Sequence, residues 1–257
     1  MGDTCVKCLV FLVLGLNALI MGCQDRKTTN RYVTPLHRAA MEGDLPEVRN
    51  LLSLGLDVRA IDNHGKTPLC WAAGGGHVKV AEVLISHGAD VNDGSLAFAV
   101  AANAPEMVEL LLLKGARPGG DPLVQAVEDG NVELARVLID YGADVDAKGV
   151  DMISGEPGDT DCDKYGETPL GVASRRGCLE VVNMLVEHKA DVNLKSRYYY
   201  PLGCAAVAGH KTIVALLLAR GARADARDGD GKTAADLADE NGHKNIGDLI
   251  RGAAPKT

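Results

Sequence analysis

The sequence predicts an all-α repeat solenoid, a row of about seven stacked helix–turn–helix units. The segment Thr-Pro-Leu occurs at residues 34–36, 67–69 and 168–170, and degenerate copies begin at Pro201 and Thr233. Each copy is followed by small residues, a Gly-centred turn and an apolar run that ends near a further Gly or a variant of it. Hydrophobic residues make up 46% of the chain but few are aromatic, which suits closely stacked small helices. Units of this kind bury their apolar faces only by stacking.

Each unit contains the signals for two short helices. Thr67 and Pro68 start the first helix of the second unit, because Thr caps a helix and Pro needs no N–H donor at the first position. In the second helix of the first unit, Val48, Leu51 and Leu52 lie at helical spacing and are expected to face the next unit. A Gly then ends that helix in most units with a left-handed cap. We expect a further Gly to turn the chain between the two helices, at positions 43, 76, 130, 177, 209 and 242.

This pattern resembles the ankyrin repeat, whose period is about 33 residues. The step from Thr34 to Thr67 is 33 residues, and the resemblance covers residues 30–251. It implies an ankyrin-repeat domain over residues 34–251, with a β-hairpin finger between successive helix pairs. In this family, partners contact the finger tips and the concave face of the first helices. The resemblance therefore implies a protein partner, and it gives no cofactor a place.

The repeat lengths are uneven, which predicts uneven fingers. The steps from Ala89 to Ala116 and from Ala116 to Ala143 are each 27 residues, and both lack the segment that forms the finger. Repeats three and four should therefore have stunted fingers. The step from Ala143 to Ala190 is 47 residues. Repeat five accordingly carries an acidic insertion of about 14 residues, at about 148–161.

The first 22 residues are predicted to be a signal peptide. Lys7 precedes an uncharged apolar stretch, Cys8–Gly22, that ends at small residues. A bilayer-spanning helix needs roughly 20 apolar residues, so this stretch is short for a span and has the length of a signal-peptide core. The alternative is a buried N-terminal helix, which would leave a very apolar helix without a place in the stack.

The end of this stretch, Ile20-Met21-Gly22-Cys23, resembles the lipobox of bacterial lipoproteins. In that family the Cys thiol receives diacylglycerol and the chain is cleaved before it. The resemblance implies a signal peptide over 1–22, lipidation at Cys23 with a tether over 23–33, and a tail at 252–257 beyond the repeats. It also implies an exported protein of the cell envelope, anchored by lipid and facing the periplasm or the outside. An ordinary cleaved leader and an uncleaved anchor remain open.

Charge and motif content favour some function classes over others. The net charge is −8, and an acidic chain is repelled by phosphate backbones. We therefore expect no nucleic-acid partner. The sequence contains no nucleophile elbow, HExxH motif or phosphate-binding Gly loop. We accordingly expect no enzymatic activity, cofactor or small-molecule substrate, and we expect a monomer.

The candidate partner-binding residues follow from their positions in the ankyrin pattern. They lie at predicted finger tips and on predicted first helices, and they are His64, Lys66, Trp71, Arg175, Arg176, Tyr198, Tyr199 and Tyr200. The three consecutive tyrosines are the strongest candidates, because half of the six Tyr of the chain lie together on a segment expected to be exposed. Tyr is enriched among the residues that dominate the binding energy of protein interfaces.

The insertion and the cysteines suggest two further sites. Asp159, Asp161 and Asp163 alternate like the start of an EF-hand loop, but Lys164 stands where that loop requires Gly, and Leu170 where it requires Glu. This favours a flexible acidic loop, and we assign no metal ligand. The cysteines of the repeats lack zinc-ligand spacing, so we expect unpaired small core residues at positions 70, 162, 178 and 204, with 178 and 204 as the conceivable disulfide pair.

Together these observations predict a non-enzymatic protein–protein interaction scaffold, tethered to the bacterial cell envelope, that binds its partner through its concave face. One alternative is a secreted or soluble periplasmic ankyrin protein that guards or inhibits an enzyme or a toxin. A second is an enzyme or calcium-binding protein that acts through the insertion at 148–166. A third is a passive structural spacer.

Overall fold

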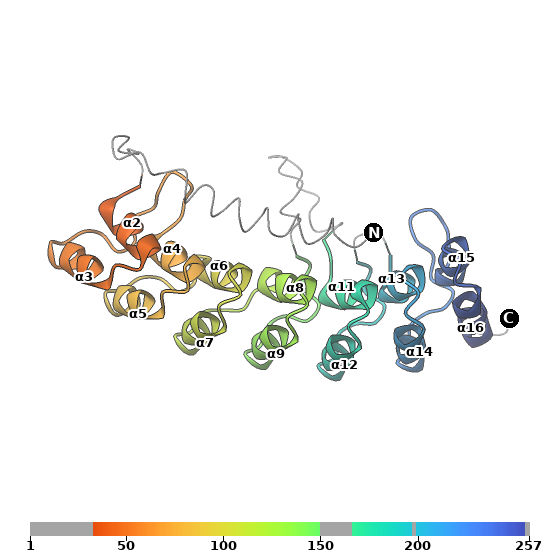
Figure 1. The fold of residues 1–257 in the computed structure, drawn as a ribbon. Helices are drawn as coiled ribbons and strands as arrows, with labels where there is room; N and C mark the ends of the chain where they lie inside the picture. The colour runs from red at the N-terminus through yellow and green to blue at the C-terminus, as the bar shows by residue number, and fades with distance from the viewer. Residues whose placement is uncertain (1–32, 150–165, 197–198, 255–257) are drawn as a thin grey trace. The chain divides into compact units, whose positions relative to one another are not determined.

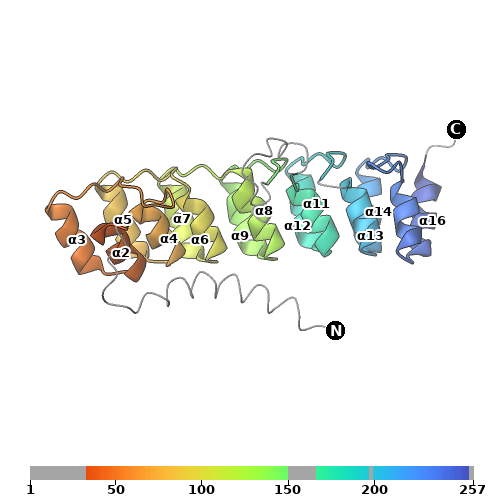
Figure 2. The same ribbon diagram turned by 90° about the horizontal axis from the view of Figure 1, so that it is seen from above.

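The computed structural model describes residues 33–149, 166–196 and 199–254. Almost all of them belong to one compact unit, Pro35–Thr257. Within the described residues this unit is built from helices that follow one another in pairs (Figure 1, Figure 2). Seven pairs are present in these ranges, which confirms the predicted solenoid and its repeat number. We number the pairs as repeats 1 to 7.

The first helix of each repeat is called the inner helix, and the second the outer helix. The inner helices are α2 (Pro35–Glu42), α4 (Pro68–Gly74), α6 (Ser95–Ala101), α8 (Gly120–Glu128), α11 (Pro169–Arg176), α13 (Pro201–Val207) and α15 (Ala234–Glu240). The outer helices are α3 (Leu45–Ser53), α5 (Val78–Ser86), α7 (Pro105–Leu113), α9 (Val132–Asp140), α12 (Leu179–Glu187), α14 (Lys211–Ala219) and α16 (Lys244–Ala253). From α6 onward, the inner helices form the upper row of Figure 1 and the outer helices the lower row.

Helix starts and turns follow the chemistry expected of the sequence. The hydroxyl oxygens of Thr67, Thr168 and Thr233 each accept a hydrogen bond from the backbone N–H three residues on, which caps α4, α11 and α15. All six predicted turn glycines between the helices have positive φ, a conformation that side-chain-bearing residues rarely adopt.

Histidines at the start of outer helices fill the space beside glycines of the preceding repeat. The His77 ring lies where a Cβ on Gly43 would be, and the His210 ring lies likewise against Gly177. His77 Nε2 also donates to the Met41 carbonyl at 3.0 Å. Close packing across these repeat boundaries thus requires a Gly in one repeat and a His ring in the next.

The core is one continuous apolar cluster that runs through the repeats. Each inner helix packs on the inner helix of the next repeat. Fully buried leucines recur at the same place in successive inner helices, including Leu36, Leu69 and Leu202, which are at most 1% exposed. Removing such a surface from water stabilises the fold by about 25 cal/mol per Å² of apolar area.

The fingers are tight turns rather than extended ladders. In the finger 60–66 the Asp62 N–H donates to the Lys66 carbonyl at 2.9 Å, and Asp228 and Lys232 repeat this bond in the finger 226–232. Among the described residues, β-pairing is limited to isolated bridges. The loops before α6 and α8 are short, since α5 ends at Ser86 and α7 ends at Leu113, which confirms the stunted fingers.

A ladder of hydrogen bonds joins the bases of neighbouring fingers. In each rung an Asn or Asp side chain accepts a backbone N–H of the next repeat. Three rungs, each 2.9 Å long, join Arg117 N to Asn92, Asp191 N to Asp146 and Arg223 N to Asn193. Between repeats 3 and 4 the position equivalent to Asn92, Asp146 and Asn193 is Gly119. Because Gly119 has no side chain, this hydrogen bond is missing there.

Several predictions fall on residues outside the described ranges. The signal peptide, Cys23 and most of the tether lie there, as do Tyr198 and the acidic positions 159–163. Within the described ranges, no helix combines the length and the hydropathy that a bilayer crossing requires. No group of His, Cys, Asp and Glu suited to a metal ion occurs in those same ranges.

Candidate partner-binding surface

The finger 60–66 is organised around Asp62, which is 6% exposed. Its Oδ1 accepts the backbone N–H groups of His64 at 2.8 Å and Lys66 at 2.9 Å, and its Oδ2 accepts the indole N–H of Trp71 at 2.8 Å. Burial acts to raise the pKa of Asp62, but the hydrogen bonds from Lys66, Trp71 and His64 outweigh it and hold that pKa below its usual value. The carboxylate therefore stays ionised and fixes the shape of the finger.

His37 of α2 fixes the finger 60–66 through hydrogen bonds to two of its carbonyls. It is fully buried on α2, and its Nε2–H is shared between the carbonyls of Ala60, at 3.1 Å, and Lys66, at 3.0 Å. Because carbonyls only accept, they fix Nε2 as the protonated nitrogen. His37 thus joins repeat 1 to the finger that follows it.

Three of the predicted partner-binding residues belong to this first cluster. Trp71 is half-buried and bonded to Asp62, so part of its binding capacity is used within the chain. The ammonium of Lys66 lies 4.8 Å from the centre of the Phe98 ring, a cation–π contact with α6. His64 is exposed at the finger tip. Their role in binding a partner stays a prediction.

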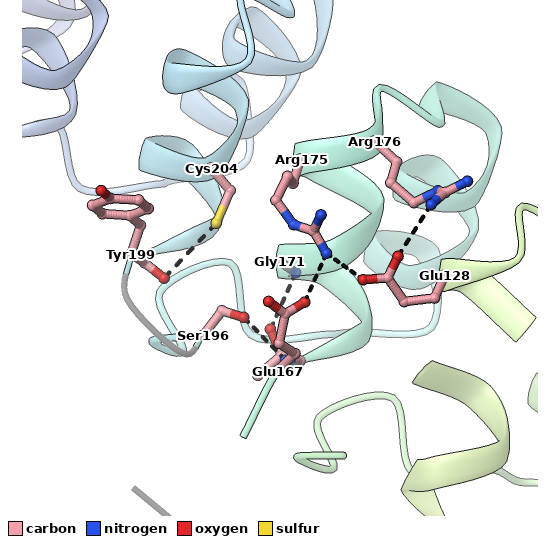
Figure 3. A network of polar contacts seen from close by, with 9 residues as sticks. Glu128, Glu167, Gly171, Arg175, Arg176, Ser196, Tyr199 and Cys204 are labelled. Carbon is pink, nitrogen blue, oxygen red and sulfur yellow. Dashed lines mark hydrogen bonds and ion pairs between the residues drawn. The ribbon is translucent and has the colours of Figure 1, made fainter. Parts of the chain in front are cut away.

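Arg175 and Arg176, at the end of α11, form a second cluster with acidic residues. Figure 3 shows both guanidinium groups turned toward Glu128 of α8. Arg176 Nη1 lies 3.1 Å from Glu128 Oε2, and Arg175 Nη2 contacts Glu128 and also lies 3.0 Å from Glu167 Oε2. Burial acts to lower the pKa of Arg175, but the charges of Glu128 and Glu167 prevail and raise it.

These ion pairs change the interpretation of the two arginines. Their side chains are 47% and 40% exposed, so a partner can reach them, but their charged ends already have partners on the inner helix of the preceding repeat. Their immediate effect is to join repeats 4 and 5 on either side of the insertion. A role in binding stays a prediction.

The third cluster lies between the fingers of repeats 6 and 7. Tyr199 and Tyr200 are half-buried and line a shallow hollow that is open to solvent. Its other lining residues come from the finger 226–232 and from α13 and α15, and they are Leu202, Gly203, Arg223, Ala226, Asp228, Lys232, Ala234 and Leu237. The structure thus brings two of the three predicted tyrosines to one concave feature.

The described cysteines are reduced and buried or half-buried. Burial raises the pKa of the Cys204 thiol to about 12, so this thiol is protonated at neutral pH. Burial also raises the pKa of the Cys70 thiol. A thiolate is the reactive form of Cys, so neither group is suited to nucleophilic chemistry.

Sequence reasoning missed Phe98, Asp228 and Lys232 as members of these clusters. The available signal was the alignment of the repeats with one another. Asp228 and Lys232 occupy the positions of Asp62 and Lys66, and Phe98 occupies the position of Trp71 in the next repeat. Comparing equivalent positions points to the same surface in each repeat, although it does not say which contacts form.

Comparison with known proteins supports the same architecture. A family model described as ankyrin repeats (3 copies) matches residues 2–95 and 96–196. The ankyrin repeat domain of human ASB11 has a similar structure, with a TM-score of 0.67 and 27% identity, over 87% of this chain and 100% of that domain. The Escherichia coli K12 protein YahD, named as an ankyrin repeat protein, is 26% identical over 202 residues, which are 72% of this chain and 94% of YahD.

Longer proteins also contain similar segments. A transient receptor potential cation channel subfamily A member 1 homolog of Caenorhabditis elegans is 31% identical over 203 residues, or 74% of this chain. This chain spans 16% of that channel's length, and 17% of the length of the chicken nuclear factor NF-kappa-B p105 subunit. These relatives share the repeats with this chain. Taken with the matched family model and the seven stacked helix pairs, they show that the chain belongs to the ankyrin-repeat family.

Proposed function

We propose that this protein is a non-enzymatic scaffold that binds a partner protein, as a monomer, through the finger side of repeats 6 and 7. The carrying observation is the hollow lined by Tyr199 and Tyr200. Ankyrin repeats are interaction modules, and a concave feature that presents two tyrosine rings on the finger side is where we expect a partner.

Tyrosines suit this task for a physical reason. Each ring offers a large, rigid contact area that loses little conformational entropy on binding, together with a hydroxyl for hydrogen bonds. Tyr200 is the N-cap residue of α13 and both rings are half-buried, so little backbone order has to be gained when a partner docks. Their replacement by Ala should cost at least about 2 kcal/mol of binding free energy if they are central to the interface.

The test is site-specific photo-crosslinking in the native cell. A photoreactive phenylalanine analogue at Tyr200 should yield a discrete crosslinked partner. The same analogue at Glu109, an exposed position on α7, is the control and should yield none. Crosslinking at Trp71 with none at Tyr200 would move the binding surface to the N-terminal repeats and contradict the proposal.

The location of the scaffold is a separate part of the proposal. We infer lipidation at Cys23 and attachment to the cell envelope from the apolar stretch 8–22 and the lipobox-like residues that end it. Two or more acyl chains would hold the protein firmly, since each buried CH2 contributes about 0.8 kcal/mol. Ser or Ala at position 23 would leave no thiol to modify.

Fractionation of cells tests this attachment. Cys23→Ala should move the protein from the membrane to the soluble fraction, or leave an uncleaved precursor that gel mobility reveals. Cys8→Ala is the matched control, because it removes a thiol from the same leader and should leave attachment and processing unchanged. If Cys23→Ala is processed normally and remains membrane-bound, lipidation at this residue is wrong.

A further inference from the structure

The inner helix α6 exposes an apolar face. Its sequence, Ser-Leu-Ala-Phe-Ala-Val-Ala, contains no charged residue. Ala97 and Ala101 are exposed, and Phe98 between them is half-buried. The inner helix α13 also lacks charge, but all of its residues are buried except Val207, which is half-buried. We call Ala97, Phe98 and Ala101 the open face of α6.

The stunted finger after α7 explains why Ala97 is exposed. In repeats 1, 2 and 5 the residues at the same position are His37, Cys70 and Gly171, and all three are buried. His37 bonds two carbonyls of the finger that follows it, and the Sγ of Cys70 lies 3.6 Å from a carbonyl of the next loop. The loop that joins α7 to α8 is too short to cover α6 in this way.

The next inner helix also leaves Ala101 uncovered. In repeat 3, Phe98 lies across the preceding helix, since a Cβ on Gly74 would be 3.5 Å from the Cδ1 of its ring. One repeat on, Gln125 has the position of Phe98, and Ala101 has that of Gly74. Gln125 instead donates its amide to both carboxylate oxygens of Asp129, each at 3.0 Å. The apolar contact that Phe98 makes at one repeat boundary is therefore missing at the next.

The charges on the two sides of the open face have opposite signs. On the side of repeat 2, the ammonium of Lys66 lies 4.8 Å from the centre of the Phe98 ring. On the side of repeat 4, Asp129 is exposed, and its bond with the neutral amide of Gln125 brings no positive charge. Residues 121–149, which form repeat 4, contain seven Asp or Glu against two Lys or Arg. A ligand of this face therefore meets a cation on one side and an excess of carboxylates on the other.

The backbone of this face favours a helix as its ligand. The N–H and C=O groups in the middle of α6 are bonded within the helix, so an extended segment would find no backbone partner there. A helix satisfies its own backbone groups and needs only a complementary side-chain surface. Ala97 and Ala101 lie one turn apart and have short side chains, so a second helix can approach closely and place large apolar side chains beside Phe98.

We propose that the open face of α6 binds an amphipathic, basic α-helix of a partner protein. The apolar side chains of that helix pack on Phe98 and Ala101, and its Lys or Arg side chains face Asp129 and the other carboxylates of repeat 4. The cation at Lys66 excludes basic side chains from the opposite side, which fixes the orientation of the helix. This surface lies apart from repeats 6 and 7, so the inference goes beyond the proposed function and does not depend on it.

A pair of synthetic peptides tests the charge and the apolar contact without the native partner. Both peptides are about 18 residues long, enough for a partly populated helix, and have Leu at every third or fourth position. One peptide has Lys at the polar positions and the other has Glu. In a fluorescence-anisotropy titration with the full chain, the Lys peptide should bind with a Kd in the micromolar range, and more weakly as salt is added. The Glu peptide should bind at least about tenfold more weakly.

Two pairs of variants localise the binding. Ala101→Arg places a long cation on the open face and should weaken binding of the Lys peptide at least about tenfold, whereas Ala215→Arg, at an exposed position of α14, should not weaken it. Asp129→Asn should weaken binding by about two- to fivefold, and Asp140→Asn, at an exposed position of α9 in the same repeat, should not. Circular dichroism checks that each variant is folded. The comparison of the two peptides and that of the two Asp variants stand even if Ala101→Arg unfolds.

Four results would overturn this binding surface. They are no binding of the Lys peptide at ~1 mM, well above a micromolar Kd; equal affinity for the two peptides; unchanged binding by folded Ala101→Arg; and equal losses in Asp129→Asn and Asp140→Asn. None of them affects the crosslinking at Tyr200, which tests repeats 6 and 7. Conversely, binding of the Lys peptide at Ala101 without any crosslink at Tyr200 would sustain this surface and contradict the proposed function.

Discussion

The two central seams of the solenoid differ in how they are held together. Repeats 4 and 5 are separated by the insertion, yet Glu128 pairs with both Arg175 and Arg176, and Arg136 Nη2 lies 2.9 Å from Glu180 Oε1. The outer helices α9 and α12 pack on each other as well. Between repeats 3 and 4 the connection is short, but the outer helices α7 and α9 make the weakest contact of any neighbouring outer pair in the described ranges.

The short seam also lacks most of the polar links. In the described ranges a side-chain hydrogen bond from Asn131 Nδ2 to Asn103 Oδ1, at 2.5 Å, joins repeats 3 and 4, while the ladder rung at Gly119 is missing. Loop length itself costs little, because doubling a loop adds only about 0.6 kcal/mol of closure entropy. A longer connection therefore need not weaken a repeat array, whereas a shortened finger removes the bonds that it carried.

The largest expected effect comes from a cavity on one side of the weak seam. Leu185→Ala in α12 removes a fully buried side chain and should cost about 2–5 kcal/mol. If repeats 3 and 4 are weakly coupled, urea should unfold the C-terminal repeats first. Far-UV circular dichroism should then show a lowered midpoint, while the fluorescence of Trp71, the single Trp of the chain, changes near its original midpoint. Equal shifts of both midpoints would show that the whole array unfolds cooperatively and that repeats 3 and 4 are not weakly coupled.

Removing a ladder rung should have the next largest effect. Asn193 accepts the Arg223 N–H at 2.9 Å and donates to the Gly221 carbonyl at 3.1 Å. Asn193→Ala should therefore lower the free energy of unfolding by about 1–2 kcal/mol. Asp225→Ala is the control, since in the described residues the Asp225 side chain accepts no backbone N–H of another repeat, and it should change stability by less than about 0.5 kcal/mol. If both variants lose a similar amount of unfolding free energy, the ladder bond at Asn193 makes no specific contribution to stability.

Restoring the missing rung should strengthen the weak seam. Gly119 has φ −68° and ψ −178°, which other residues adopt easily, and a Cβ there would meet no atom within 4 Å. Gly119→Asn should stabilise the protein by about 1 kcal/mol, by accepting the Asp144 N–H and by reducing the entropy of the unfolded chain. Slower hydrogen exchange at Asp144 would confirm the bond. Gly229→Asn is the control. Its side chain has no backbone N–H of a neighbouring repeat to accept, so it should give no comparable gain.

The smallest effect is expected at the ion pairs of the long seam. Glu128→Gln should lower stability by less than about 1 kcal/mol, because the guanidinium groups that it pairs with are about half exposed. The loss should shrink as salt is added, since salt screens exposed charges. Glu180→Gln, in a single and more exposed pair, should cost less still. A large loss of stability in Glu128→Gln that does not change with salt would show that Glu128 acts through packing and not through its charge.

The fold was predictable because each repeat carries its own copy of the signal. Thr67, Thr168 and Thr233 cap their helices as their positions suggest, and the turn glycines have positive φ. The stunted fingers also followed from counting, since a step of 27 residues cannot hold the helix pair and a full finger. These features are local, so a single sequence specifies them.

The contacts of the binding surface were less predictable. Arg175 and Glu128 are 47 positions apart, and their contact depends on the packing of α11 on α8. The hollow lined by Tyr199 and Tyr200 is formed by side chains of two neighbouring repeats, so the pattern within one repeat does not predict it. Trp71 was expected on a first helix, but its bond to Asp62 depends on the rotamer that the finger selects.

The glycine–histidine contacts between repeats have a consequence for how such a chain can be rearranged. The ring of His77 needs Gly43 before it, and the ring of His210 needs Gly177. Repeats 3 and 4 meet at the same place through Asn103 and Asn131 instead. Boundaries of the glycine–histidine kind, which include Gly209 with His243, are thus compatible with one another, whereas the boundary of repeats 3 and 4 is not compatible with them. Exchanging repeats between the two kinds would bring unmatched edges together, and we expect only repeats cut at compatible boundaries to be interchangeable between proteins.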